Sequence, residues 1–312
     1  MNRDEKSLRV ELRQWRQFVA LAEELHFGRA ALRLHMTQPP LTQAIAGLEA
    51  ALGVRLFDRT RRSVQLTPAG QALLPEAREL LARAQALPGL ARAAADGEVG
   101  HLRLAFVSTV GYELLPRWVL AFRQRWPQVA LELTEATGDV QLELLARGEA
   151  DAGFMLHSPG FAMAGLAHAR IASEPLVVAL PQSHPLATQE QPRLQALLDE
   201  PLVIFPRRIL PSVHDAVFQL YHAAGRAPRV AQEAIQMQTI VNLVAAGLGL
   251  AWVPHSVRQF QRTGVVYRSP ALPRGRALPT CETSLVWRAD AVSPTLARFM
   301  DFAQPERALL RQ

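Results

Sequence analysis

Four aliphatic residues near the start of the chain recur at helical spacing. They are Leu41, Ile45, Leu48 and Leu52. Intervals of three or four residues place such side chains on one face of a helix. Just before them come Thr37, a residue type that favours the N-cap, and Pro39 and Pro40, which a first helical turn tolerates because its amides have no helical partner. The pattern predicts a helix that begins near residue 38 and buries its aliphatic face.

Polar side chains lie off the aliphatic face near the start of that helix. Gln38, Thr42 and Gln43 are short hydrogen-bonding residues, which a helix that reads base edges in the major groove requires at its exposed N-terminus. Residues 27–34 form a second short amphipathic segment, joined to the first by a turn at residues 35–36. The two segments predict a helix-turn-helix; the alternative is a helical packing module with no contact to DNA.

A basic turn follows the helix pair. Val54 and Leu56 alternate with polar residues, as do Val64 and Leu66, which predicts two short strands around an Arg-Thr-Arg-Arg turn at residues 59–62. Arginines on such a wing can bind phosphates or enter the minor groove. The residues predicted to contact DNA, from both helices and the wing, are Arg29, Arg33, Thr37, Gln38, Pro39, Pro40, Thr42, Gln43, Arg59, Arg61 and Arg62.

A heptad pattern comes next. Thr67 and Pro68 repeat the cap-and-proline start of a helix. The residues spaced alternately by four and three along it are Leu73, Ala77, Leu80, Ala84, Leu87 and Ala91. This seam predicts pairing with a second copy of the chain; the alternative is a single amphipathic helix on a domain surface. Pro75 is expected to bend the helix, and Pro88 with Gly89 to end or kink the seam.

From residue 101 onward the pattern changes to strands that alternate with helices. Strands at residues 102–107, 129–134 and 151–156, with helices between them, predict a parallel sheet covered on both faces. A second set has strands near residues 176–180, 202–205, 229–233 and 250–254. Residues 281–288 and 295–303 then predict a strand and a helix that return to the first lobe.

These motifs together resemble the LysR-type transcriptional regulators. The matching segments are residues 27–46, 48–49, 52–59, 66–70, 184–187 and 243–249, so the resemblance covers nearly the whole chain. It implies an α/β protein with a winged helix-turn-helix head at residues 1–67 and a linker and dimerisation helix at 68–97. Residues 98–312 would form a two-lobed effector-binding domain with the type 2 periplasmic-binding-protein-like fold. Lobe I would comprise about 98–172 and 269–312, and lobe II about 173–268.

Ligands of such lobes bind at the carboxyl ends of strands, where loops and helix N-termini converge. The residues that meet this rule, and that line the inter-lobe cleft in similar regulators, are Ser108, Thr109, Val110, Thr137, Leu156, Pro211, Ser212, Val213 and Gln238. In family members that sense small aromatic or diene acids, an arginine can stand where this chain has Leu156. The leucine argues against an acid held in that way, with Arg207 or Arg208 as substitutes. Many relatives also carry arginine in place of Gln43, so the base preference is expected to differ.

Composition supports a DNA-binding head. The chain has 312 residues, enough for about two domains, and a net charge of +6; residues 1–67 hold 11 basic and 7 acidic side chains, most of that excess. Cys281 is the single cysteine, which excludes an intrachain disulfide and fits a reducing compartment. The longest apolar run, residues 240–254, is too short to span a bilayer, and no signal-like core follows Met1. A cytoplasmic protein without membrane contact is expected.

No catalytic motif in the sequence indicates an enzyme. The sequence contains no Gly-x-Ser-x-Gly elbow, phosphate-binding loop or His-Glu-x-x-His motif, and neither a cofactor nor a metal is expected. The expected function is therefore that of a transcriptional regulator switched by a small molecule. Its partners would be a dyad-symmetric DNA site, the effector, further copies of the chain as a dimer of dimers, and RNA polymerase as a further candidate. The rival functions are a cytoplasmic solute-binding protein and an enzyme of unrecognised type.

Overall fold

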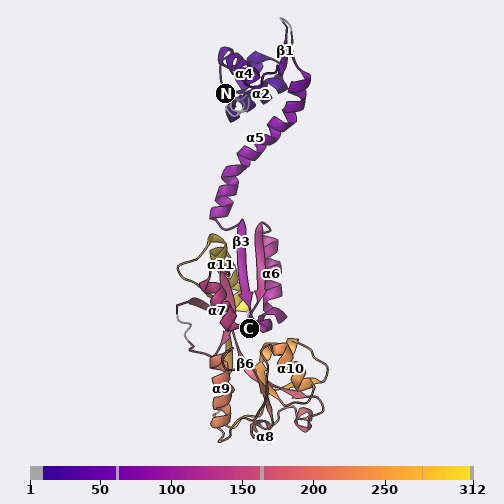
Figure 1. Cartoon of the computed structure of the whole chain (residues 1–312), viewed down its shortest axis with the longest axis vertical. Coiled ribbons are helices and arrows are strands. Elements are labelled where there is room, and N and C mark those ends of the chain that lie inside the picture. Colours follow the sequence, from indigo (N-terminus) through magenta and orange to yellow (C-terminus); the bar gives the residue numbers. More distant parts are fainter. Residues whose placement is uncertain (1–9, 61–62, 162–164, 276, 310–312) are drawn as a thin grey trace. The chain divides into compact units, whose positions relative to one another are not determined.

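The computed structural model of the chain describes residues 10–60, 63–161, 165–275 and 277–309. It divides into two compact units between Arg92 and Ala93, which are described separately (Figure 1). Among the described residues, no helix is long and apolar enough to cross a membrane.

The first unit packs three helices and a hairpin around one core. The helices are α2 (Leu12–Glu24), α3 (Phe27–Arg33) and α4 (Gln38–Leu52), and the antiparallel strands are β1 (Phe57–Arg59) and β2 (Val64–Leu66). The predicted aliphatic face of α4 is fully buried at Leu41, Ile45 and Leu48, where it meets Phe18 and Leu21 of α2. The helix-turn-helix and wing predicted from hydrophobic spacing are therefore present.

Of two local predictions about α4 and the hairpin, the first is confirmed only in part and the second was wrong. Thr37 occupies the N-cap position but makes no capping hydrogen bond. A cap accepts from the second or third amide of the helix, and here those positions are Pro39 and Pro40, which have no N–H to donate. The first strand begins at Phe57 and not at Val54, which is exposed. The Glu49 carboxylate accepts hydrogen bonds from the amides of Leu56 and Phe57 at 2.9 and 3.1 Å. This side chain, and not a longer strand, therefore holds the segment that leads into the hairpin.

Helix α5 (Pro68–Ala95) leaves this head. Thr67 precedes it, and its hydroxyl accepts the amide of Gly70 at 3.1 Å. The helix continues through both Pro75 and Pro88, so of the two outcomes predicted at Pro88 and Gly89, an end or a kink, it does not end there. A proline removes one amide donor, and the residues on either side keep the helical conformation.

The first lobe of the second unit is built on a mixed sheet. Its strands are β3 (Gly100–Phe106), β4 (Val129–Glu135), β5 (Ala152–His157), β11 (Thr280–Trp287) and the first half of β6 (Ala167–Pro181). Strand β3 runs parallel to β4 and β5, whereas β11 runs antiparallel to β5 and β6. The covering helices are η1 (Ser108–Tyr112), α6 (Leu114–Arg125), α7 (Gly138–Ala146) and α11 (Pro294–Leu309). An aromatic core of Trp118, Phe122, Phe154 and Phe299 joins sheet and helices.

The second lobe continues from the same sheet. Its elements are η2 (Pro185–Thr188), α8 (Leu194–Leu198), β7 (Leu202–Ile204), α9 (Pro211–His222), β8 (Val230–Glu233), α10 (Met237–Ala245), β9 (Ala251–Pro254), η3 (His255–Gln259) and β10 (Val265–Arg268). The strand expected at residues 176–180 is the second half of the 15-residue strand β6, which pairs with β9 and β10 after leaving β11. The predicted two-lobed α/β fold is confirmed, with β6 as a single strand shared by both lobes.

Candidate nucleic-acid interface and ligand cleft

The N-terminal turn of α4 is exposed. Gln38, Pro39, Pro40 and Gln43 face solvent. Thr42 is half-buried, and its hydroxyl donates to the carbonyl of Gln38 at 3.1 Å. Directly behind them the aliphatic face is locked into the head. The hydroxyl of Thr37, which caps no amide, is exposed beside this turn. The helix thus offers amides and hydroxyls from a rigid support, as direct base readout requires.

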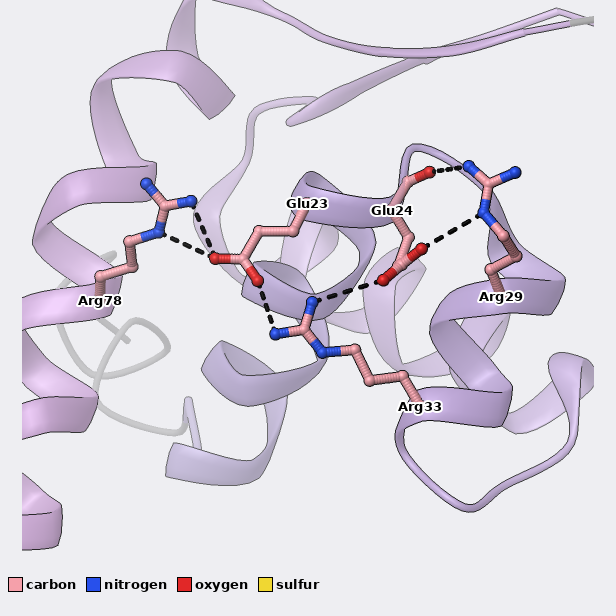
Figure 2. Close-up of polar contacts among 5 residues, drawn as sticks. All are labelled: Glu23, Glu24, Arg29, Arg33 and Arg78. Carbon is pink, nitrogen blue, oxygen red and sulfur yellow. Dashed lines mark hydrogen bonds and ion pairs between the residues drawn. The ribbon is translucent and has the colours of Figure 1, made fainter.

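The arginines of α3 are bound by carboxylates of α2. Arg29 Nε lies 3.2 Å from Glu24 Oε2, and its Nη2 donates to the Glu24 carbonyl at 2.5 Å. Arg33 contacts Glu23 Oε2 at 2.7 Å and Glu24 Oε1 at 3.5 Å. Glu23 also accepts two hydrogen bonds from Arg78 of α5, at 2.8 and 3.0 Å (Figure 2). The Arg78 hydrogen bonds, with the nearby Arg33, hold the pKa of Glu23 below its ordinary value.

The wing is fastened to α4 through Glu49. Besides the two hairpin amides, this carboxylate binds Arg59 at 2.6 Å, and the Arg59 guanidinium lies 5.3 Å from the centre of the Phe27 ring. The hairpin turn is closed by the Thr60 hydroxyl, which accepts the amide of Ser63 at 3.0 Å. Arg59 is therefore held within the head. The other two predicted wing contacts, Arg61 and Arg62, lie outside the described residues.

A cavity of about 170 Å³ lies between the lobes of the second unit. The predicted residues that line it are Ser108, Thr109, Thr137, Leu156, Pro211 and Ser212. The remaining three do not. Val110 and Val213 are buried in the cores of the two lobes, and Gln238 borders a different hollow. Each of the three follows a lining residue directly, and one residue turns a helical side chain by roughly 100°.

Sequence reasoning missed most of the apolar wall. Its side chains include Leu142, Met155, Phe161, Phe205, Ile209 and Ile235. Phe205 and Ile235 lie one and two residues after the ends of β7 and β8, so the strand-end rule could have found them if it had been applied to those two strands. The cavity is thus mainly hydrophobic.

Few polar groups reach the cavity. The Thr109 hydroxyl oxygen is buried and has no hydrogen-bond partner among the described residues. Ser212 accepts the amide of Ser158 at 3.0 Å, and the Ser158 hydroxyl donates to the Ser212 carbonyl at 2.9 Å, which ties the two lobes together. The only charged residues in the described lining are Asp139 and Arg208. Arg208 Nη1 lies 3.5 Å from Asp139 Oδ2.

The second predicted arginine is not at the cavity. Arg207 makes two hydrogen bonds to Asp215 at 2.7 and 2.8 Å, which hold the pKa of Asp215 below its ordinary value. Of the two arginines predicted to substitute for one at position 156, only Arg208 is placed to meet a ligand, and it already faces a carboxylate.

Comparison with known proteins gives matches over nearly the whole chain. Residues 12–71 match the bacterial regulatory helix-turn-helix protein, lysR family, and residues 95–308 match the LysR substrate binding domain. The HTH-type transcriptional regulator IlvR of Caulobacter vibrioides is 47% identical over 288 residues, covering 92% of this chain and 95% of that protein. The regulator AlsR of Bacillus subtilis is 36% identical over 308 residues, covering 97% and 98%.

Solved structures show the same fold. The LysR family transcriptional regulator CbnR superposes with a TM-score of 0.80 at 34% identity, covering 94% of this chain and 100% of that one. Full-length CbnR complexed with its target DNA gives 0.81 at 32% identity, covering 96% and 100%.

Proposed function

The chain belongs to the LysR family of bacterial transcriptional regulators, and we propose that it reads DNA through the exposed start of α4 and senses a small, uncharged, mostly apolar molecule in the inter-lobe cavity. As a member of that family it is a sequence-specific DNA-binding regulator with an effector-binding domain. The observation that carries the DNA-reading proposal is the polar first turn of α4 on a fully buried aliphatic face. We further propose a cytoplasmic location and contact with RNA polymerase.

A gel shift separates this function from its two rivals. The full-length protein should retard DNA from the region upstream of its gene, or between that gene and a divergent neighbour. A solute-binding protein or an enzyme would leave such DNA unshifted. If no fragment of that region is bound at micromolar protein and low salt, the DNA-reading proposal is wrong.

The first prediction concerns base readout. Thr42→Ala and Gln43→Ala should each weaken specific binding by about 1–3 kcal/mol per lost base contact and relax sequence preference, because both side chains lie at the exposed start of α4. Competition gel shifts with single-base operator variants measure both effects. Gln85→Ala, at an exposed position of α5, is the matched control. Unchanged affinity and preference in both α4 variants would show that another element reads the bases.

We propose that α5 pairs two copies. The predicted seam leucines of its outer half are exposed, at 42% for Leu80 and 61% for Leu87, whereas Ala77 of the predicted seam is buried in the head's own core, so that part of the prediction was wrong. An unpartnered leucine row at heptad spacing is stabilised when a second helix covers it. Two such copies would place two α4 helices on successive major-groove faces of a dyad-symmetric site, and two dimers would form the tetramer.

For the effector, we propose that Thr109 meets its polar atom. A buried hydroxyl without a partner gains a hydrogen bond when a ligand supplies one. The apolar wall suits a hydrophobic body, and the Asp139–Arg208 pair leaves no unbalanced charge in the described lining for an acid. A ligand that fits one lobe spacing better than another would shift the population toward it.

The second prediction tests this site. A compound that changes transcription should raise the melting temperature of the wild type more than that of Thr109→Val, because one lost hydrogen bond weakens binding by about 1 kcal/mol. Ser212→Ala is the companion variant, since Ser212 borders the same cavity but its hydroxyl is already bound to Ser158. If wild type and both variants respond equally, the effector binds elsewhere.

A further inference from the structure

Glu23 joins three helices of the head at one carboxylate. It lies in the last turn of α2 and meets Arg33, the last residue of α3, through one oxygen and Arg78 of α5 through the other. Figure 2 shows Glu23 between the two guanidinium groups, and Arg33 in turn between Glu23 and Glu24. The contact to Arg78 uses two donors of one guanidinium, so it fixes a direction as well as a distance.

This joint lies beside the stripe that holds α5 to the head. Gly70, Ala77 and Leu81 are the buried residues of that helix, and Ala77 directly precedes Arg78. A narrow stripe of small and aliphatic contacts resists separation but only weakly resists rotation of the helix about its own axis, because apolar contacts have little directionality. A directional ion pair at the edge of the stripe resists that rotation.

Rotation of α5 would matter because leucines beside the buried stripe are exposed. Leu80 and Leu87 lie two and nine residues beyond Arg78, and both side chains are exposed. If they pair with a second copy, the rotation of α5 against its own head sets how far apart the two α4 helices lie. Small angular changes at the joint are therefore converted into changes of half-site spacing.

We propose that Glu23 and Arg78 are positioning residues that set the half-site spacing at which two copies bind DNA, with Arg33 completing this joint instead of contacting phosphate. The inference rests on the proposed DNA reading by α4 and pairing through α5. Arg33 has carboxylates of both Glu23 and Glu24 within 3.5 Å, so its guanidinium group is already engaged within the head. The pKa of Arg33 is raised by the Glu23 hydrogen bond, in keeping with this pairing.

The decisive comparison uses Arg78→Gln and Arg83→Gln in the full-length protein. Arg83 lies on the same helix and pairs with Glu79 of that helix, so its loss removes an equal charge without touching the head. The DNA probes are the footprinted site from the upstream region, the same site with two base pairs inserted or removed at its centre, and one isolated half-site.

Arg78→Gln should discriminate between the natural and altered spacings about fivefold less than the wild type, the size expected from losing one well-oriented exposed ion pair. Binding to the isolated half-site should stay unchanged, which shows that the head is folded. Arg83→Gln should behave as the wild type does. If Arg78→Gln and Arg83→Gln discriminate equally well between the natural and altered spacings, the inference is wrong. The proposed function still stands in that case if the wild type shifts the natural site.

Salt dependence tests the place of Arg33. Each phosphate contact contributes about 0.9 to the slope of log affinity against log salt concentration. Arg33→Gln should therefore leave the slope unchanged, since Arg33 binds carboxylates. A slope shallower by about 0.9 per protomer would place Arg33 on phosphate and overturn its assignment to the joint. A wild type that shifts no DNA would overturn the proposed function and this inference with it.

Discussion

Leu80→Glu is expected to abolish pairing of two copies and to reduce affinity for the full DNA site by at least about a hundredfold. A dimer holds its second head near the second half-site at high effective concentration, and that gain is lost when the copies separate. The substitution would bury two carboxylates in an apolar seam, which costs several kcal/mol unless they are paired. Light scattering at micromolar concentration measures the mass, and gel shifts measure the affinity.

Ala82→Glu is the matched control for that change. Ala82 is exposed on the same helix but lies off the heptad row, so it introduces the same charge outside the seam. It should leave both mass and affinity close to those of the wild type. A wild-type protein that is monomeric, or a Leu80→Glu variant that keeps the wild-type mass, would contradict pairing through α5.

Gly70→Ala is expected to destabilise the head strongly. A Cβ at Gly70 would lie 2.2 Å from the carbonyl oxygen of Leu56 and 2.8 Å from a methyl group of Leu66. The first of these neighbours is backbone, so the overlap is relieved only by moving α5 away from the wing. Such overpacking costs about 3 kcal/mol or more, which lowers the melting temperature of a small domain by roughly 10–20 °C.

Gly89→Ala makes the same substitution in the same helix, and its effect on stability should have the opposite sign. A Cβ at Gly89 would meet nothing within 4 Å, so the change only reduces the freedom of the unfolded chain and should stabilise by about 0.5–1 kcal/mol. Thermal melts of the two variants followed by circular dichroism give the comparison. Equal melting temperatures would show that α5 and the wing do not approach as described.

Long runs of regularly spaced hydrophobic residues predicted the helices reliably, because those side chains must be buried in the core. The spacing of Leu41, Ile45 and Leu48 predicted both α4 and its buried face, since polar substitutions there would disrupt the head's core. Local chemistry was less reliable where two rules act on the same residues. Threonine is a favoured residue at the N-cap, yet Pro39 and Pro40, which follow Thr37, lack the amide hydrogens that a capping hydroxyl would accept.

Contacts between distant residues could not be predicted from spacing. Glu23 and Arg78 are 55 positions apart, and nothing in the sequence distinguishes Arg78 from the neighbouring Arg83, which pairs within its own helix. The cavity was located through the ends of strands, but which of two successive helical residues faces it depends on helix rotation. For that reason Thr109 and Ser212 line the cavity whereas Val110 and Val213 do not.

Strand β6 has a consequence for how the ligand-binding unit can change during evolution. Its first half pairs with β11 and its second half with β9 and β10, so one stretch of backbone completes both sheets. A genetic crossover at residue 172 would take β5 and the first half of β6 from one parent and β11 from the other, so β11 would pair on both sides in registers that were selected with a different neighbour. We therefore expect the two lobes to be inherited together, with new ligand preferences arising by point substitution in the cavity wall and not by exchange of a lobe.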